Sequence, residues 1–119
     1  MQDFRRISVW KKSHAFTLKI YKLSQSFPKE ETYGLTSQLR RASTSIPTNI
    51  AEGCVKNTNP EYSRFLYISL GSASEVEYLL MICNDLHMID ENNYKTLSEE
   101  IQEIKKMLTA LIKKVKTVK

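Results

Sequence analysis

The stretch from Leu35 to Gly53 reads LTSQLRRASTSIPTNIAEG and has the spacing of one long amphipathic helix. Its apolar side chains recur at steps of three or four, which stacks them along one helix face. These side chains are Leu35, Leu39, Ala42, Ile46 and Ile50. Pro47 removes a backbone donor inside the pattern, so we expect the helix to be kinked or broken there, with hydroxyls of residues 43–45 serving the freed backbone. Gly53 follows the last apolar residue, as a helix-ending glycine does.

Similar patterns predict a helix on each side of this stretch and a fourth near the end of the chain. Pro28 closes the first pattern. Asn59-Pro60 is a start signal for the third, because Asn59 can cap a helix that has Pro60 at its first position, and Asp90 can cap the fourth. The predicted helices cover approximately residues 9–26, 32–53, 60–86 and 91–118. Short connections force antiparallel neighbours. We therefore predict an all-α, antiparallel up-down-up-down four-helix bundle that forms a single domain over residues 1–119.

The predicted helix over residues 60–86 has two apolar lines, where a helix of a monomeric bundle needs one. The first is a near-heptad core seam made of Tyr62, Phe65, Leu66, Ser69, Ala73, Val76, Leu79, Leu80 and Cys83. The second lies on the opposite side and is made of Tyr67, Gly71, Ser74, Tyr78 and Ile82. Large exposed apolar patches usually mark contacts, so we interpret the second line as an oligomer interface. The alternative is that its tyrosines only decorate a solvated face.

The fourth predicted helix has the most regular pattern of the chain. Its apolar positions step by three and four, which predicts a single stripe facing the core. They are Tyr94, Leu97, Ile101, Ile104, Leu108, Leu111, Val115 and Val118.

Composition limits the class of protein. The chain has 119 residues and a net charge of +5, and no apolar run reaches the ~20 residues that a membrane span needs. No secretory signal opens it, so we expect a cytoplasmic protein that does not enter membranes, with Cys54 and Cys83 as reduced thiols.

Sequence motifs for catalysis or cofactor binding are absent. Neither His14 nor His87 has a glutamate three residues earlier, as di-metal bundles require, and the three glycines are isolated rather than grouped in a phosphate loop. Nothing in the sequence around Cys54 marks an activated nucleophile. We predict a protein that is not an enzyme and that uses no metal and no cofactor.

Positive charge is the better indication of function. Residues 4–51 hold nine Lys or Arg and two acids, whereas residues 104–119 hold six Lys and no acid. An antiparallel bundle brings the start of the first helix beside the end of the fourth. We therefore predict contact with RNA or another nucleic acid through two converging basic segments. Their side chains are Arg5, Arg6, Lys11, Lys12, Lys19, Lys22, Lys105, Lys106, Lys113, Lys114, Lys116 and Lys119.

Aromatic and arginine side chains near these segments have separate predicted roles. Trp10 and Tyr21 could stack on unpaired bases. Arg40 and Arg41 have no acid near them in sequence, so we expect them to form ion pairs with the acidic third quarter of the chain, either between helices or between subunits. The alternative for all the lysines is a solvated face that keeps the protein soluble.

A family resemblance adds to this interpretation. The text YGLTSQLRRASTSIPTNIAEG, from Tyr33 to Gly53, closely resembles the signature of the four-helix bundle family named for proteins encoded in 23S ribosomal RNA intervening sequences. The likeness extends to VWKKSHAFTLKIYKL, FPKEE and EYSRFLYISLGSASEVEYLL. Its motif positions, which we expect to be structural, are Leu39, Arg40, Arg41, Ile46, Pro47, Asn49, Ile50, Glu52 and Gly53.

The resemblance implies a bacterial, left-handed antiparallel bundle whose relatives assemble as homopentamers and have no established catalytic activity. The chain is also similar to the accessory protein of diversity-generating retroelements, a basic pentameric bundle that binds nucleic acid and a reverse transcriptase. Two functions follow as hypotheses: a homo-oligomer that binds nucleic acid, or a scaffold that binds another protein without touching nucleic acid.

Overall fold

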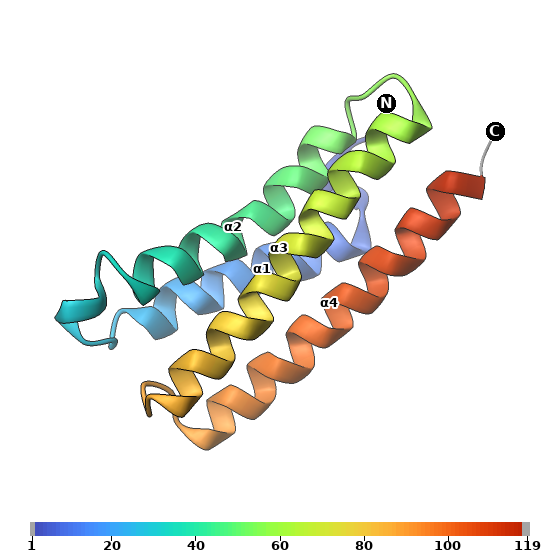
Figure 1. The fold of residues 1–119 in the computed structure, drawn as a ribbon. Helices are drawn as coiled ribbons and strands as arrows, with labels where there is room; N and C mark the ends of the chain where they lie inside the picture. Colours follow the sequence, from blue (N-terminus) through green and yellow to red (C-terminus); the bar gives the residue numbers. More distant parts are fainter. Residues whose placement is uncertain (1, 118–119) are drawn as a thin grey trace.

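The computed structural model describes residues 2–117 and contains four long antiparallel helices (Figure 1). The elements are η1 (Phe4–Arg6), α1 (Ser8–Ser24), η2 (Lys29–Glu31), α2 (Leu35–Gly53), α3 (Asn59–Asp85) and α4 (Glu91–Thr117). No strand occurs in this range. α2 packs most extensively against α3, and the contact between α1 and α4 is the slightest of the neighbouring pairs. The predicted all-α four-helix bundle is confirmed.

Helix boundaries differ slightly from the prediction. α1 ends at Ser24, and its chain continues through turns to Phe27, which is buried just before Pro28. Turns at residues 32–34 follow the short η2, so α2 starts at Leu35, three residues later than expected. The predicted end of the fourth helix, Val118, lies outside the described residues, as does Lys119.

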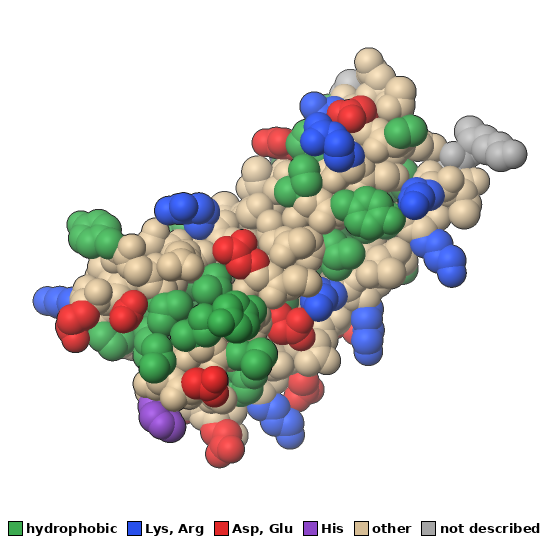
Figure 2. Space-filling model, viewed as in Figure 1, with side chains coloured by type: hydrophobic (Ala, Val, Ile, Leu, Met, Phe, Trp, Pro, Cys, Tyr) green, Lys and Arg blue, Asp and Glu red, His purple; other side chains and the backbone are tan. Residues whose placement is uncertain are grey.

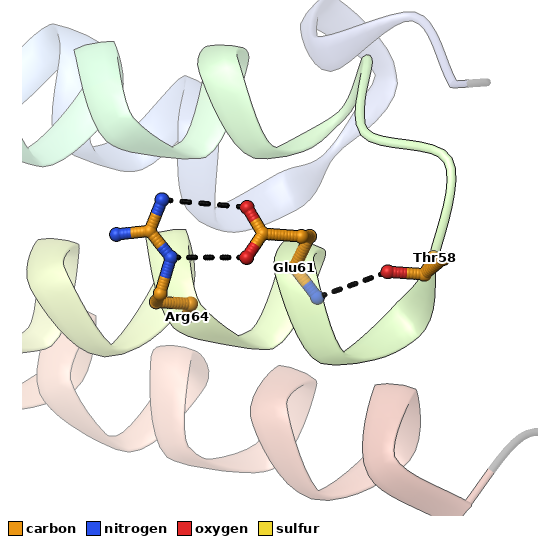
Figure 3. A network of polar contacts seen from close by, with 3 residues as sticks. All are labelled: Thr58, Glu61 and Arg64. Carbon is orange, nitrogen blue, oxygen red and sulfur yellow. Dashed lines mark hydrogen bonds and ion pairs between the residues drawn. The ribbon is translucent and has the colours of Figure 1, made fainter.

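The start of α3 is fixed by a different cap from the one expected. Thr58, not Asn59, is the N-cap: its hydroxyl accepts the backbone N–H of Glu61 at 3.3 Å (Figure 3). The Glu61 carboxylate in turn takes a forked ion pair from Arg64, with Nε–Oε2 at 3.1 Å. This pairing holds the pKa of Glu61 below its ordinary value. At α4 the expected cap is confirmed, because Asp90 accepts the backbone N–H of Asn93 at 2.7 Å.

α2 runs without interruption through Pro47, so of the two predicted alternatives, a kink or a break, the break does not occur. Proline has no N–H for the Ser43 carbonyl four residues earlier. The hydroxyl of Thr17, on α1, lies 3.0 Å from that carbonyl and 2.9 Å from the Ser13 carbonyl of its own helix, so the two carbonyls share its one proton. The Ser43 and Thr44 hydroxyls, which were expected to bond to the Ser43 carbonyl, do not do so. The Ser43 hydroxyl is buried without a partner among the described residues, and the Thr44 hydroxyl donates to the Arg40 carbonyl. A neighbouring helix thus satisfies the backbone that proline leaves open.

The core follows the predicted stripes with one exchange. On α4, Ile112 is buried and Leu111 is only partly buried, so the stripe steps from Leu108 to Ile112 to Val115. A stripe through Leu111 and a stripe through Ile112 both have steps of three and four, which is why the sequence pattern alone predicted Leu111. On α3, Phe65 lies at the core margin and the other seam residues are buried.

Close packing between α2 and α3 depends on Gly53. A Cβ atom on Gly53 would lie 2.9 Å from the ring of Tyr62 and 3.1 Å from the Cβ of Phe65. The buried hydroxyl of Ser69 also donates to the Ile46 carbonyl of α2 at 2.8 Å. The motif that ends α2 therefore serves to bring two helices together.

α3 has a further property that follows from its two apolar lines. Within residues 2–117 it is the one helix whose length and mean hydropathy, 1.2 over 18 residues, would also suit a membrane span. It carries charged side chains at Glu61, Arg64, Glu75, Glu77 and Asp85, and its buried line packs in the bundle.

Candidate nucleic-acid and assembly surfaces

The start of α1 and the end of α4 lie at the same end of the bundle (Figure 1). An ion pair between Lys19 Nζ and Glu100 Oε2, 2.6 Å long, joins the two helices along their length. Cations from both segments therefore gather at one end, which we call the basic end. It comprises Arg5, Arg6, Lys11, Lys12, Lys113, Lys114 and Lys116. All are exposed except Lys12, which is half-buried.

Other predicted cations do not join this cluster. Lys22 lies in the last turn of α1, at the opposite end of the bundle. Lys105 and Lys106 lie in the middle of α4, and Lys105 pairs with Glu77 at 2.8 Å. Lys19 is held by Glu100. These pairings across helices reduce the charge that Lys19 and Lys105 can offer to a ligand.

Most cations of the basic end are not committed to a carboxylate. Arg5 pairs with Asp3 at 3.1 Å, and the backbone N–H of Arg5, together with its guanidinium, keeps the pKa of Asp3 below its ordinary value. Within the part of the chain that the structure describes, Lys11, Lys113 and Lys114 form no ion pair. Their charge is available to a ligand.

Two grooves at this end contain lysines. One lies between α3 and α4, where Lys116 Nζ sits 5.6 Å from the ring centroid of Tyr67 and Lys113 lines the wall. The other brings Lys56, from the connection between α2 and α3, beside Lys114. Figure 2 shows basic side chains along this half of α4. Sequence analysis missed Lys56, although its place just after α2 put it at the basic end.

The aromatic side chains on α1 are already stacked within the chain. Trp10 lies parallel to His14, with centroids 5.0 Å apart, and its edge meets Phe4. The guanidinium of Arg40 lies 4.9 Å from the ring centroid of Tyr21. One face of each ring is therefore covered.

Arg40 forms no ion pair among the described residues, so the expected pairing inside the chain is wrong. Its guanidinium instead donates to the Ser24 hydroxyl at 2.7 Å and to the Tyr21 carbonyl at 3.2 Å, which ties α2 to the end of α1. Arg41 is exposed and reaches only the hydroxyl of Ser37, at 3.4 Å.

The remaining motif positions support α2. Leu39, Ile46, Pro47, Ile50 and Gly53 are all buried. The amide of Asn49 donates to the carbonyl and the hydroxyl of Ser45. Glu52 is exposed at the rim of a groove between α1 and α2.

Four members of the second apolar line of α3 are exposed, namely Tyr67, Gly71, Ser74 and Tyr78, whereas Ile82 is half-buried and packs against the core. We call the whole line the α3 outer stripe. Tyr67 and Tyr78 are 49% and 60% exposed, and Met81 beside them is 47% exposed. Among residues 2–117, no atom beyond the adjoining helix backbone lies within 4 Å of where a Cβ on Gly71 would be. Figure 2 shows a continuous hydrophobic patch over the second half of α3 with acidic side chains at its margin. The stripe is therefore largely uncovered within the described chain: Lys116 contacts Tyr67 at one end, and Ile82 packs against the core at the other.

Both cysteines pack in the interior of the bundle. Cys54 and Cys83 are both free and buried. Burial raises the pKa of the Cys83 thiol to about 11, and it also raises that of Cys54. An activated nucleophile needs the opposite shift. In residues 2–117 no three His, Cys, Asp or Glu side chains are grouped so that they could hold a metal ion.

Comparison with known proteins places the chain in a family. Residues 5–110 match the family of the 23S rRNA-intervening sequence protein. A crystal structure of a protein with unknown function, from the S23 ribosomal protein family of Bacteroides thetaiotaomicron VPI-5482, is 29% identical. It superposes with a TM-score of 0.82 over 88% of this chain and 95% of its own. No curated protein matches the sequence. The chain therefore belongs to the family of 23S rRNA-intervening sequence proteins.

Proposed function

We propose that this protein is a non-catalytic, cytoplasmic homo-oligomer, pentameric as the family resemblance implies, that binds RNA or another nucleic acid through its basic end. The observation that carries the proposal is the gathering of uncommitted cations from η1, α1 and α4 at one end of the bundle. Such cations neutralise phosphates and release counterions, whatever the base sequence. Assembly would repeat the cluster in each copy and strengthen binding through multivalency.

A salt-dependent titration tests this proposal. A labelled structured RNA should bind at low salt, and its affinity should fall steeply, but remain measurable, near physiological salt. Absence of binding at low salt would overturn the proposal.

Charge reversal then locates the surface. Lys113→Glu with Lys114→Glu takes the net charge from +5 to +1, because each reversal removes two positive charges. Lys29→Glu with Lys95→Glu makes the same change with exposed residues outside the basic end. We expect the first pair to lower RNA affinity much more than the second. Equal losses would mean that only net charge matters and that the basic end is not the binding surface.

A second candidate function is a scaffold that binds another protein without contacting nucleic acid. The exposed α3 outer stripe favours it, since large apolar patches usually mark contacts. A protein partner that stays bound after nuclease treatment, from a chain that does not bind RNA at low salt, would support this candidate. Loss of every partner on nuclease treatment would exclude it.

A further inference from the structure

The bundle exposes apolar surface on two different sides. One is the α3 outer stripe. The other is a groove between α1 and α2, which we call the α1–α2 groove; it is lined by Trp10, Leu18, Tyr21, Thr44, Thr48 and Ala51, among others. Leu18 is 58% exposed and Tyr21 is 42% exposed there. α3 turns its buried line toward the bundle, so its outer stripe does not face this groove within one chain.

The two surfaces have complementary shapes. The outer side of α2 presents small side chains at helical spacing, Ser37, Thr44, Thr48 and Ala51, which leaves room for a helix to approach. The α3 outer stripe presents two large rings, Tyr67 and Tyr78, separated by Gly71 and Ser74. Large side chains on one helix and small ones on the other are the arrangement by which an apolar helix face fits a groove.

Their charges are complementary as well. Arg40 and Arg41 line the continuation of the α1–α2 groove, and neither has a carboxylate partner among the described residues. Glu75 and Asp85 flank the α3 outer stripe and form no ion pair within residues 2–117. Contact between the two surfaces would bring arginine to carboxylate, a pairing for which the planar guanidinium is suited.

Pairing of the stripe with its own copy is electrostatically worse. The stripe runs from Tyr67 to Ile82, so a two-fold axis through its middle would place Glu75 near the Glu75 of the second copy. Like charges that face one another across an interface oppose association. Contact between two different surfaces avoids this repulsion.

We propose that the α3 outer stripe of one copy docks into the α1–α2 groove of the next. This inference rests on the proposed homo-oligomer and specifies which surfaces form it. Contact between two different patches is head-to-tail, and it closes into a ring when the rotation between copies allows. Every copy then uses both of its exposed apolar surfaces.

Cysteine cross-linking tests the pairing directly. One chain carries Tyr78→Cys, and a second chain of different size carries Ser37→Cys, Thr44→Cys or Thr48→Cys, each in turn. All four positions lie on exposed or half-buried side chains, whereas native Cys54 and Cys83 are buried, so the unchanged protein is the control. The chains are mixed, allowed to exchange subunits and treated with a short bismaleimide.

We expect covalent dimers in at least one mixture and no more than the control amount in either variant alone. A chain carrying both changes should give a ladder of covalent multimers. Efficient cross-linking of Tyr78→Cys with itself would overturn the inference in favour of a two-fold contact. Failure of every mixture in a protein that light scattering shows to be oligomeric would overturn it too. A chain that light scattering shows to be monomeric would instead refute the proposed oligomer itself.

Discussion

The inner and outer sides of α3 differ in the surroundings of the glycine found at each. On the inner side, α3 packs so closely against Gly53 of α2 that a Cβ there would meet the Tyr62 ring at 2.9 Å. On the outer side, Gly71 faces open space: beyond the adjoining helix backbone, no atom of the described residues lies within 4 Å of its missing Cβ. A glycine in the middle of a helix costs about 0.5–1 kcal/mol relative to alanine. Close packing within the chain explains the inner glycine, Gly53, whereas the outer glycine, Gly71, indicates a contact with another molecule.

Matched valine substitutions give the largest expected difference between the two sides. Gly53→Val forces a branched side chain into the α2–α3 contact and should lower the free energy of unfolding by about 3 kcal/mol. At concentrations too low for assembly, Gly71→Val should change it little, because no described residue obstructs the new side chain. Chemical denaturation followed by circular dichroism measures both. Equal costs at the two sites would contradict the contrast between inner and outer packing.

High pH should destabilise the inner side through Cys83. Burial raises the pKa of this thiol from 9.0 to about 11, so the folded state keeps its proton while the unfolded state loses it. The stabilisation is complete below pH 9 and is lost as pH rises toward 11, by at most about 3 kcal/mol.

Urea titrations at several pH values between 8 and 11 measure this loss. Cys83→Ala should have a shallower decline than the unchanged protein over the same range. An unchanged slope in that variant would show that Cys83 is not responsible, and the buried Tyr62 phenol, whose pKa is also raised, would be the next group to test.

The hydrogen bond between Thr17 and the Ser43 carbonyl, next to Pro47, tests a polar contact inside the bundle. Thr17→Val keeps the shape of the side chain but removes the donor to the Ser43 carbonyl, which should cost about 1–2 kcal/mol. In a Pro47→Ala background the backbone regains its own donor, so the same change should cost less. A double-mutant cycle in urea measures the difference. Equal costs in both backgrounds would show that Thr17 does not replace the missing N–H.

Gly71→Ala should have the smallest effect on the isolated chain, and it should be favourable. Alanine has the higher helix propensity, so unfolding at concentrations too low for assembly should require up to about 1 kcal/mol more. A destabilised chain would mean that Gly71 has a structural role inside the monomer.

The sequence predicted features that depend on local periodicity. The inner and outer lines of α3 follow from side-chain spacing, and the structure places Tyr67 and Tyr78 outside and Leu66 and Val76 inside as expected. Periodicity failed where two registers fit equally well, as with Leu111 and Ile112 on α4.

Side-chain periodicity does not predict contacts between residues that are distant in sequence. The hydroxyl of Thr17 reaches a carbonyl 26 residues away, and Lys19 meets a carboxylate 81 residues away. These pairings depend on how neighbouring helices are rotated and shifted, which no single helix pattern encodes. For the same reason the sequence did not distinguish the cations held by carboxylates on other helices, Lys19 and Lys105, from those at the basic end.

The most direct test of the account is the mass of the protein in solution, because the outer side of α3 is assigned to assembly. Light scattering of the unchanged protein should give a mass well above the 13.8 kDa of one chain. Tyr67→Glu with Tyr78→Glu should reduce it to 13.8 kDa while circular dichroism shows the helices intact. A mass of 13.8 kDa for the unchanged protein, or an undiminished mass for the double variant, would contradict the account.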